Sequence, residues 1–197
     1  AVLHSRYERN TMAVENGLAD IIMSDQKPRA VIMVGAYNPC AAFIHLARQS
    51  GLDAIFLNVS FVGAEALAEK LGDQGDGVIV TQVVPHFGSA LPIVEEYRKA
   101  LKAWDPSIQP TFGSLEGYIA ARILWQALET IQGPLTKEGI VNALDGLGEF
   151  DIGLGQPPLR LGPKDHQACH RVWPTILRGG KAVPFQWEEL GTQLIRR

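Results

Sequence analysis

The pattern of apolar and polar positions is most regular between Arg29 and Gly63. An all-apolar run from Ala30 to Gly35 predicts a short strand that is buried on both faces. Apolar residues then recur at helical spacing until Gly51, which is placed to end a helix. A second apolar run, Ala54–Val59, predicts another strand. Strand, helix and strand in this order form a βαβ unit, so the two strands should run parallel.

Short stretches after these two strands are the first place to look for function. Tyr37 and Asn38 follow the first strand, and Ser60 and Phe61 follow the second. Ligands of parallel sheets collect beyond the carboxyl ends of the strands. Asn38 is predicted to cap the helix, with Pro39 at the first helical position. The Tyr37 ring either rests on the helix as a loop residue or, in our preferred interpretation, forms one wall of a ligand cleft.

Similar patterns extend the predicted sheet on both sides. Ala1–Leu3 is predicted to be the end of a strand, and an amphipathic helix is expected from about Thr11 to Ser24. Gly77–Val84 predicts another buried strand. Strands and helices in alternation are typical of an α/β fold with a doubly wound parallel sheet.

The pattern changes after Pro85, where three helices are predicted in succession. They cover Leu91–Trp104, about Ser114 to Ile131, and a segment that Thr136 caps. No strand is predicted between them, so these helices need another surface to cover. The second helix is predicted to turn a stripe of large apolar side chains inward: Leu115, Ile119, Leu124, Leu128 and Ile131.

The last part of the chain is predicted to be extended. Leu159–Leu161 predicts a short strand, and Arg171–Arg178 and Lys181–Phe185 predict two more around Gly179-Gly180. Two glycines between extended runs are a signal of a two-residue β-hairpin.

Several segments together resemble a known family. VGAYNPCAAFIHLARQSGL and FLNVSFVGAEALAEKLGDQGDGVIVTQVVP are similar to the second lobe of a type I periplasmic solute-binding protein, with the leucine/isoleucine/valine-binding family of ABC importers as the closest group. SLEGYIAARILWQAL and PKDHQACHRVWPTILRGGK are similar to later segments of that family. The resemblance follows one linear order over nearly the whole chain. It implies a fragment, because family members are about twice this long and the missing part is the amino-terminal half.

The resemblance also implies a domain organisation and a role. Residues 1–84 would form an α/β segment of the second lobe, residues 85–165 would be helices of the first lobe, and residues 166–197 would return to the second lobe. Such a protein captures a small solute between two lobes that close around it, and delivers it to the membrane permease of an ABC importer. It would be periplasmic, with a signal peptide upstream of this fragment, and would need no cofactor.

By the same resemblance, ligand contacts are expected from the strand ends and from the first helices after Pro85. Amino-acid-binding members have a carboxylate near the position of Ser60, where it pairs with the ligand's ammonium group. Serine cannot neutralise a buried cation, and Glu65 and Glu116 are the alternative carboxylates for this role. We therefore expect another small carboxylate, such as an aromatic acid, in preference to a simple α-amino acid. The predicted ligand-binding residues are Tyr37, Asn38, Ser60, Phe61, Phe87 and Ser114.

Composition narrows the remaining possibilities. The 197 residues are 46% hydrophobic and 20% charged, which is typical of a globular protein. A net charge of −3 does not indicate the excess of positive charge that is typical of nucleic-acid-binding proteins. No run is long enough for a membrane span. Two cysteines, Cys40 and Cys169, define neither a disulfide framework nor a metal site.

Catalysis is not expected. The five histidines are scattered and form no compact metal spacing. VGAYNP follows a strand but lacks the glycines of a phosphate-binding loop. Two alternatives stay open: a ligand-sensing domain of a regulator or receptor with the same fold, and an α/β enzyme that uses Cys40 or a histidine.

The fragment itself is expected to bind solute poorly, and to associate as a homodimer by exchanging the helices between Leu91 and Leu147.

Overall fold

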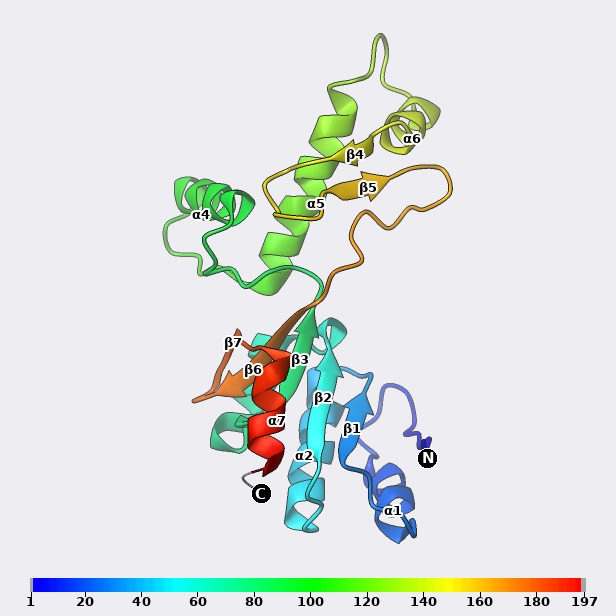
Figure 1. The fold of residues 1–197 in the computed structure, drawn as a ribbon, viewed down its shortest axis with the longest axis vertical. Helices are drawn as coiled ribbons and strands as arrows, with labels where there is room; N and C mark the ends of the chain where they lie inside the picture. Colours follow the sequence, from blue (N-terminus) through cyan, green and yellow to red (C-terminus); the bar gives the residue numbers. More distant parts are fainter. Residues whose placement is uncertain (1, 196–197) are drawn as a thin grey trace. The chain divides into compact units, whose positions relative to one another are not determined.

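The computed structural model describes residues 2–195 (Figure 1). Side chains are described up to residue 191. The chain forms two compact units. One contains the residues up to Gln82 and those from Trp173 onward, and is here named the sheet unit. The other, Val83–Val172, is named the helical unit.

The sheet unit is built on a mixed, largely parallel sheet in the order β1-β2-β3-β6-β7. β1 pairs with β2 and β2 with β3 in parallel, whereas β6 and β7 are antiparallel additions. The predicted βαβ unit and the α/β fold class are therefore confirmed. The strands are β1 (Ala30–Met33), β2 (Ile55–Val59), β3 (Ile79–Gln82), β6 (Trp173–Arg178) and β7 (Lys181–Pro184).

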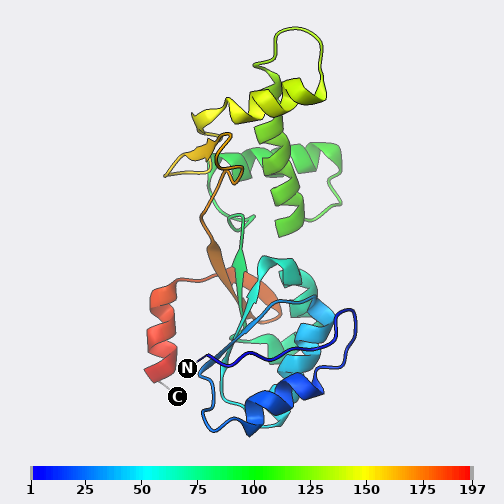
Figure 2. The same cartoon turned by 90° about the vertical axis from the view of Figure 1, so that its right-hand side faces the viewer.

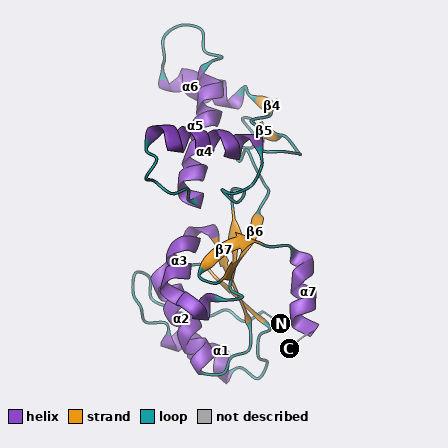
Figure 3. Ribbon diagram, turned by 90° about the vertical axis from the view of Figure 1, so that its left-hand side faces the viewer, coloured by secondary structure: helices purple, strands orange, loops and turns teal. Residues whose placement is uncertain are grey.

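Helices cover both faces of this sheet. α1 (Glu15–Met23), α2 (Tyr37–Gln49) and α3 (Ala64–Leu71) lie on one side and α7 (Trp187–Ile195) on the other (Figure 3). Beneath α7, the core is formed by Ile79, Ile176 and Phe185. Two 3-10 turns, η1 (Ser60–Val62) and η2 (Gly72–Gly75), complete the unit.

The hairpin predicted at Gly179-Gly180 is confirmed. Both glycines have positive φ angles, 56° and 71°, which side-chain-bearing residues rarely adopt. This turn joins β6 to β7, and β7 forms one edge of the sheet.

The prediction that Ala30–Gly35 is buried on both faces is wrong. β1 is the other edge strand of the sheet among the described residues, and its residues alternate between exposed and partly exposed. Ile32 is 70% exposed and Val34, just after the strand, is 71% exposed. An apolar run identifies a strand, but its neighbours decide how much of it is buried.

Two predictions near the amino terminus are also corrected. Residues 2–3 are not part of a strand, because no ladder holds them, and Ala1 lies outside the described residues. α1 begins at Glu15 and not at Thr11. The Thr11 hydroxyl donates to the Glu8 carbonyl at 2.7 Å and accepts from the Ala13 N–H, which closes a turn before the helix.

The predicted start of α2 is two residues late. Ala36 is the N-cap residue, with extended backbone and no side-chain cap, and Tyr37 is the first helical residue. Asn38 therefore does not cap the helix, and Pro39 occupies the third position. Proline fits there because the first-turn N–H groups have no partner within the helix.

The helical unit contains three helices and a small sheet. α4 (Pro92–Trp104), α5 (Phe112–Leu128) and α6 (Lys137–Asp145) follow the order predicted after Pro85 (Figure 2). Thr136 caps α6 as predicted, since its hydroxyl accepts from the Gly139 N–H at 3.0 Å. β4 (Gly148–Phe150) pairs with β5 (Leu159–Leu161) in antiparallel fashion.

The apolar stripe predicted on α5 is only partly correct. Leu115 and Ile119 are buried, but Leu124 is 41% exposed. Leu124 lies five positions beyond Ile119, which is about 140° around a helix of 3.6 residues per turn. The buried face continues instead to Ala127, eight positions beyond Ile119.

Candidate functional site

The carboxyl ends of β1 and β2 meet at one edge of the sheet unit. The strands are parallel and pair in register, with Ala30 opposite Ile55 and Met33 opposite Asn58. α2 begins four residues after β1, and η1 begins immediately after β2. The structure therefore brings two predicted pairs, Tyr37 with Asn38 and Ser60 with Phe61, to the same edge.

Tyr37 and Asn38 are the first two residues of α2. The Tyr37 side chain is exposed and that of Asn38 is half-buried. The first turn of α2 contains no acidic residue, and no side chain caps it. Its N–H groups and the positive end of the helix dipole consequently favour an anionic group at this place.

Ser60 and Phe61 lie in the short turn η1. The Gly63 N–H donates to the Ser60 carbonyl at 3.0 Å, and the positive φ of Gly63, 74°, allows α3 to begin directly afterwards. Ser60 is half-buried, whereas the Phe61 ring is 75% exposed. The turn therefore holds a large aromatic ring in solvent beside a neutral hydroxyl.

Phe87 lies in a turn of the helical unit that packing holds in place. Its ring stacks on His86 at 4.4 Å and contacts Phe112 of α5 edge-on at 5.0 Å, both measured between ring centroids. The Arg98 guanidinium donates to the Phe87 and Ser89 carbonyls, each at 2.9 Å. The Phe87 side chain is thus part of an aromatic cluster at the start of α5.

Ser114 takes part in the hydrogen bonds that begin α5. Its N–H donates to the Thr111 hydroxyl at 3.1 Å, and its own hydroxyl accepts from the Thr111 N–H at 3.2 Å, which together form a capping box. The Tyr97 hydroxyl of α4 also lies 2.6 Å from the Ser114 oxygen. Sequence reasoning missed Tyr97 and Thr111, although a hydroxyl residue three positions before Ser114 is a capping signal.

The remaining acidic candidates are exposed, and the nucleophilic candidate is unsuited to reaction. Glu65 is an exposed residue in the first turn of α3, and Glu116 is exposed on α5. Burial raises the pKa of the Cys40 thiol to about 11, so the reactive thiolate is scarce at neutral pH. No group of three or more His, Cys, Asp or Glu side chains in the described part of the chain could hold a metal ion. Among those residues, no helix is long and apolar enough to cross a membrane.

The chain is similar to a known protein family and to solved structures. Residues 6–181 match the family described as periplasmic binding protein. A possible leucine/isoleucine/valine-binding protein from Rhodopirellula baltica SH 1 is 52% identical, with a TM-score of 0.90 over 95% of this chain and 50% of that one. No match was found among curated proteins.

More distant structures share the fold. A leucine binding protein from Thermotoga maritima is 19% identical, with a TM-score of 0.76 over 91% of this chain and 49% of that one. A fatty acid ABC transporter substrate-binding protein from Thermomonospora curvata is 21% identical, with a TM-score of 0.73 over 90% of this chain and 46% of that one. This chain thus spans about half the length of the solved structures that it matches. The match over residues 6–181 and the 52% identity confirm the resemblance seen in the sequence: the chain belongs to the periplasmic binding protein family.

Proposed function

We propose that this chain forms the carboxyl-terminal part of the solute-binding component of an ABC importer. The sheet unit would belong to the second lobe and the helices of residues 85–165 to the first lobe, with the solute captured between them. The family indicates a periplasmic or extracellular location. A membrane permease as partner and a signal peptide upstream of residue 1 are part of the same proposal.

The observation that supports this proposal most is the pair of aromatic side chains just beyond the carboxyl ends of β1 and β2, where ligands of parallel sheets bind. Tyr37 is 38% and Phe61 is 75% exposed, and they follow adjacent parallel strands. Exposed aromatic rings at such an edge supply flat apolar walls, and the tyrosine adds a hydroxyl for hydrogen bonding. Phe87 and Ser114 are proposed as contacts from the first lobe, and Asn38 and Ser60 as polar contacts from the second.

The proposed solute is a small carboxylate, with an aromatic acid preferred to a simple α-amino acid. Ser60 offers no charge that would pair with an ammonium group. The uncapped first turn of α2, next to Tyr37, favours a carboxylate. An aromatic ring on the same ligand would match the exposed rings of Tyr37 and Phe61.

Substitution of these aromatic residues tests the proposal. The test is made on a two-lobed protein in which this chain is combined with the half of the Rhodopirellula baltica protein that it does not span, here named the complementing half. Calorimetry with phenylacetate should show affinity about tenfold weaker or more in Tyr37→Ala and in Phe61→Ala, because each loses an apolar contact of about 1.5 kcal/mol or more. The control is Trp104→Ala, since Trp104 is an aromatic residue, 85% exposed, at the end of α4. Equal affinity in all four proteins would contradict the proposed site.

Self-association of the fragment is a separate part of the proposal. Several large apolar side chains of the helical unit are exposed, and burial against a second copy would remove them from water. Light scattering at micromolar concentration should therefore give the mass of a homodimer, and a clean monomer would contradict it. These side chains are Trp104, Leu124, Trp125, Leu135 and Val141.

A further inference from the structure

The side chain of Asn58, in β2, is a polar group that is enclosed without a partner. The residue is 0% exposed. Neither the amide oxygen nor the amide nitrogen has a hydrogen-bond partner among the described residues. Buried amides are nearly always paired, because an unpaired one bears the whole cost of leaving water. An unpaired amide inside a folded unit therefore needs an explanation.

The surroundings of Asn58 come from this chain alone, because β2 lies between β1 and β3. Its neighbours in register are Met33 on β1 and Val80 on β3, two apolar side chains that do not satisfy an amide. Other buried polar residues on the same face are paired. The Gln82 amide nitrogen donates to the Thr175 hydroxyl at 3.3 Å, and that hydroxyl donates to the Val80 carbonyl at 2.8 Å. Asn58 thus differs from the polar residues beside it.

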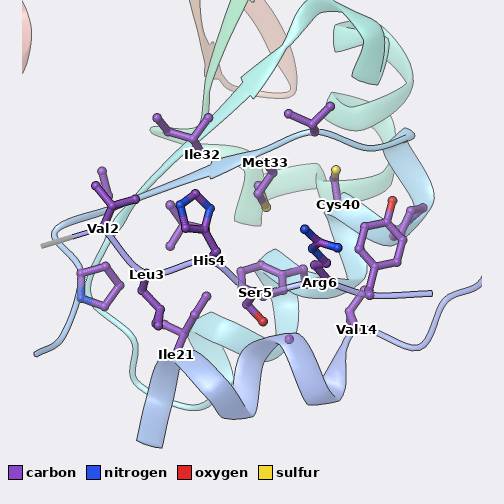
Figure 4. Close-up of a pocket in the computed structure, with 18 residues that line it drawn as sticks. Val2, Leu3, His4, Ser5, Arg6, Val14, Ile21, Ile32, Met33 and Cys40 are labelled. Carbon is purple, nitrogen blue, oxygen red and sulfur yellow. The ribbon is translucent and has the colours of Figure 1, made fainter. Parts of the chain in front are cut away.

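The Asn58 side chain points toward α2. Figure 4 shows the Met33 side chain on the side of β1 where Cys40 of α2 lies. Asn58 is level with Met33 in the sheet, so its side chain is on this side as well. Phe56, two residues earlier in β2, contacts Phe43 of α2 edge-on, with 6.4 Å between the ring centroids.

The contact of Phe56 with Phe43 also gives the level of Asn58 along α2. The helix runs opposite to β2, because it leads from the carboxyl end of β1 back to the start of β2. Two residues of a strand rise about 6.6 Å, which corresponds to about four residues of a helix. Four residues before Phe43 is Pro39, in the first turn of α2. The Asn58 amide therefore lies beside that turn.

The first turn of α2 offers further donors at this level. The N–H groups of Tyr37 and Asn38, its first two residues, have no partner within the helix. No side chain caps them, and the turn contains no acidic residue. Two backbone N–H groups and the Asn58 amide nitrogen are thus donors at the same end of the helix. A carboxylate, which accepts several hydrogen bonds, fits such a set of donors.

We propose that the Asn58 amide belongs to the solute site and selects a carboxylate, to which it donates together with the two N–H groups of α2. This inference rests on the proposed function and adds a residue that determines specificity. The polar atoms of the amide are closed to water in this structure, so the first turn of α2 and η1 must separate for the solute to reach them. The amide gives up no existing hydrogen bond when it binds the carboxylate.

Calorimetry of the two-lobed protein with two probes tests the proposal. Phenylacetate carries a carboxylate, and 2-phenylethanol carries a neutral hydroxyl on the same ring and chain. Asn58→Leu removes the amide and keeps its branched shape. It should weaken phenylacetate binding about tenfold or more, because a hydrogen bond to a charged group is lost, and change 2-phenylethanol binding less than about threefold. Equal weakening of both probes would indicate a merely structural role and overturn the proposal.

The unsubstituted protein supplies a second measurement. The side-chain NH₂ resonances of Asn58, identified by their loss in Asn58→Leu, should shift in nitrogen–proton spectra when phenylacetate is added. Resonances that stay in place while phenylacetate binds would overturn the inference alone. If the unsubstituted protein binds neither probe, the proposed function is wrong and this inference is wrong with it.

Urea denaturation of the 197-residue chain tests whether the amide is unpaired. Asn58→Leu should leave the midpoint unchanged or raise it, since an apolar group of the same shape replaces an unpaired polar one. Thr175→Val is the matched control: it removes a buried hydroxyl that is paired, so it should lower the midpoint and leave the preference for phenylacetate unchanged. A midpoint lowered as much in Asn58→Leu as in Thr175→Val would show that the amide is already paired, and would contradict the proposal.

Discussion

The two groups of candidate ligand contacts differ in how much of the fold depends on them. In the sheet unit, Tyr37 and Phe61 hold their rings at the surface after adjacent strands. In the helical unit, Phe87 packs on Phe112 and Ser114 completes a capping box. The first group is free to gain contacts with a ligand, whereas the second group already contributes to stability. Substitutions of the first group, in the sheet unit, should therefore weaken ligand binding with little effect on stability. Substitutions of the second group, in the helical unit, should weaken both ligand binding and stability.

The largest expected effect is on the aromatic cluster of the helical unit. Phe112 is 5% exposed and contacts both His86 and Phe87. Phe112→Ala should lower the free energy of unfolding of the helical unit by about 3–5 kcal/mol, measured by urea denaturation. Phe61→Ala should change stability by no more than about 0.5 kcal/mol, because its ring is already in water. Similar losses of stability in both variants would contradict the difference between the two groups of residues.

A second effect is expected within α2, where Cys40 is buried one turn after the exposed Tyr37. Burial raises the pKa of the Cys40 thiol from its ordinary value of 9.0 to about 11. The unfolded chain loses this proton first, so stability should be intact below pH 9 and should fall by about 2 kcal/mol as pH rises to 11. Unfolding measured across this range should lose most of that slope in Cys40→Ala. An unchanged slope would show that other groups cause it.

The smallest of these effects concerns the start of α5. Thr111→Ala removes the hydroxyl that accepts the Ser114 N–H, and should lower the free energy of unfolding by about 1 kcal/mol. Thr111→Ser keeps the hydroxyl and is the control. If the alanine variant were as stable as the serine variant, the capping box would not contribute to the stability of the helical unit.

Much of the fold could be predicted because its signals are local. The apolar runs at Ala30 and Ala54, the Gly179-Gly180 turn and the Thr136 cap each depend on neighbouring residues only. The wrong predictions concern features that depend on residues distant in the sequence. β1 is exposed because no described strand covers its outer edge, which its own apolar sequence does not reveal.

Other elements escaped prediction because their signals are weak. β4 has three residues, Gly148–Phe150, and forms only by pairing with β5. α7 follows the hairpin where the sequence gives no clear pattern. The ligand-contact predictions placed Tyr37 and Phe61 at one edge because parallel strands share it, but the contacts of Ser114 with Tyr97 come from tertiary packing. The six proposed ligand contacts stay a prediction until binding is measured.

Calorimetry of solute binding tests whether the solute needs both lobes and whether it is an aromatic acid. It compares leucine, valine and phenylacetate, each added to the 197-residue chain and to its complex with the complementing half. We expect no tight binding to the chain alone, because half of the proposed cleft is missing. In the complex, we expect a dissociation constant for phenylacetate at least about tenfold below that of leucine. Submicromolar binding to the chain alone, or leucine as the tightest ligand of the complex, would contradict these expectations.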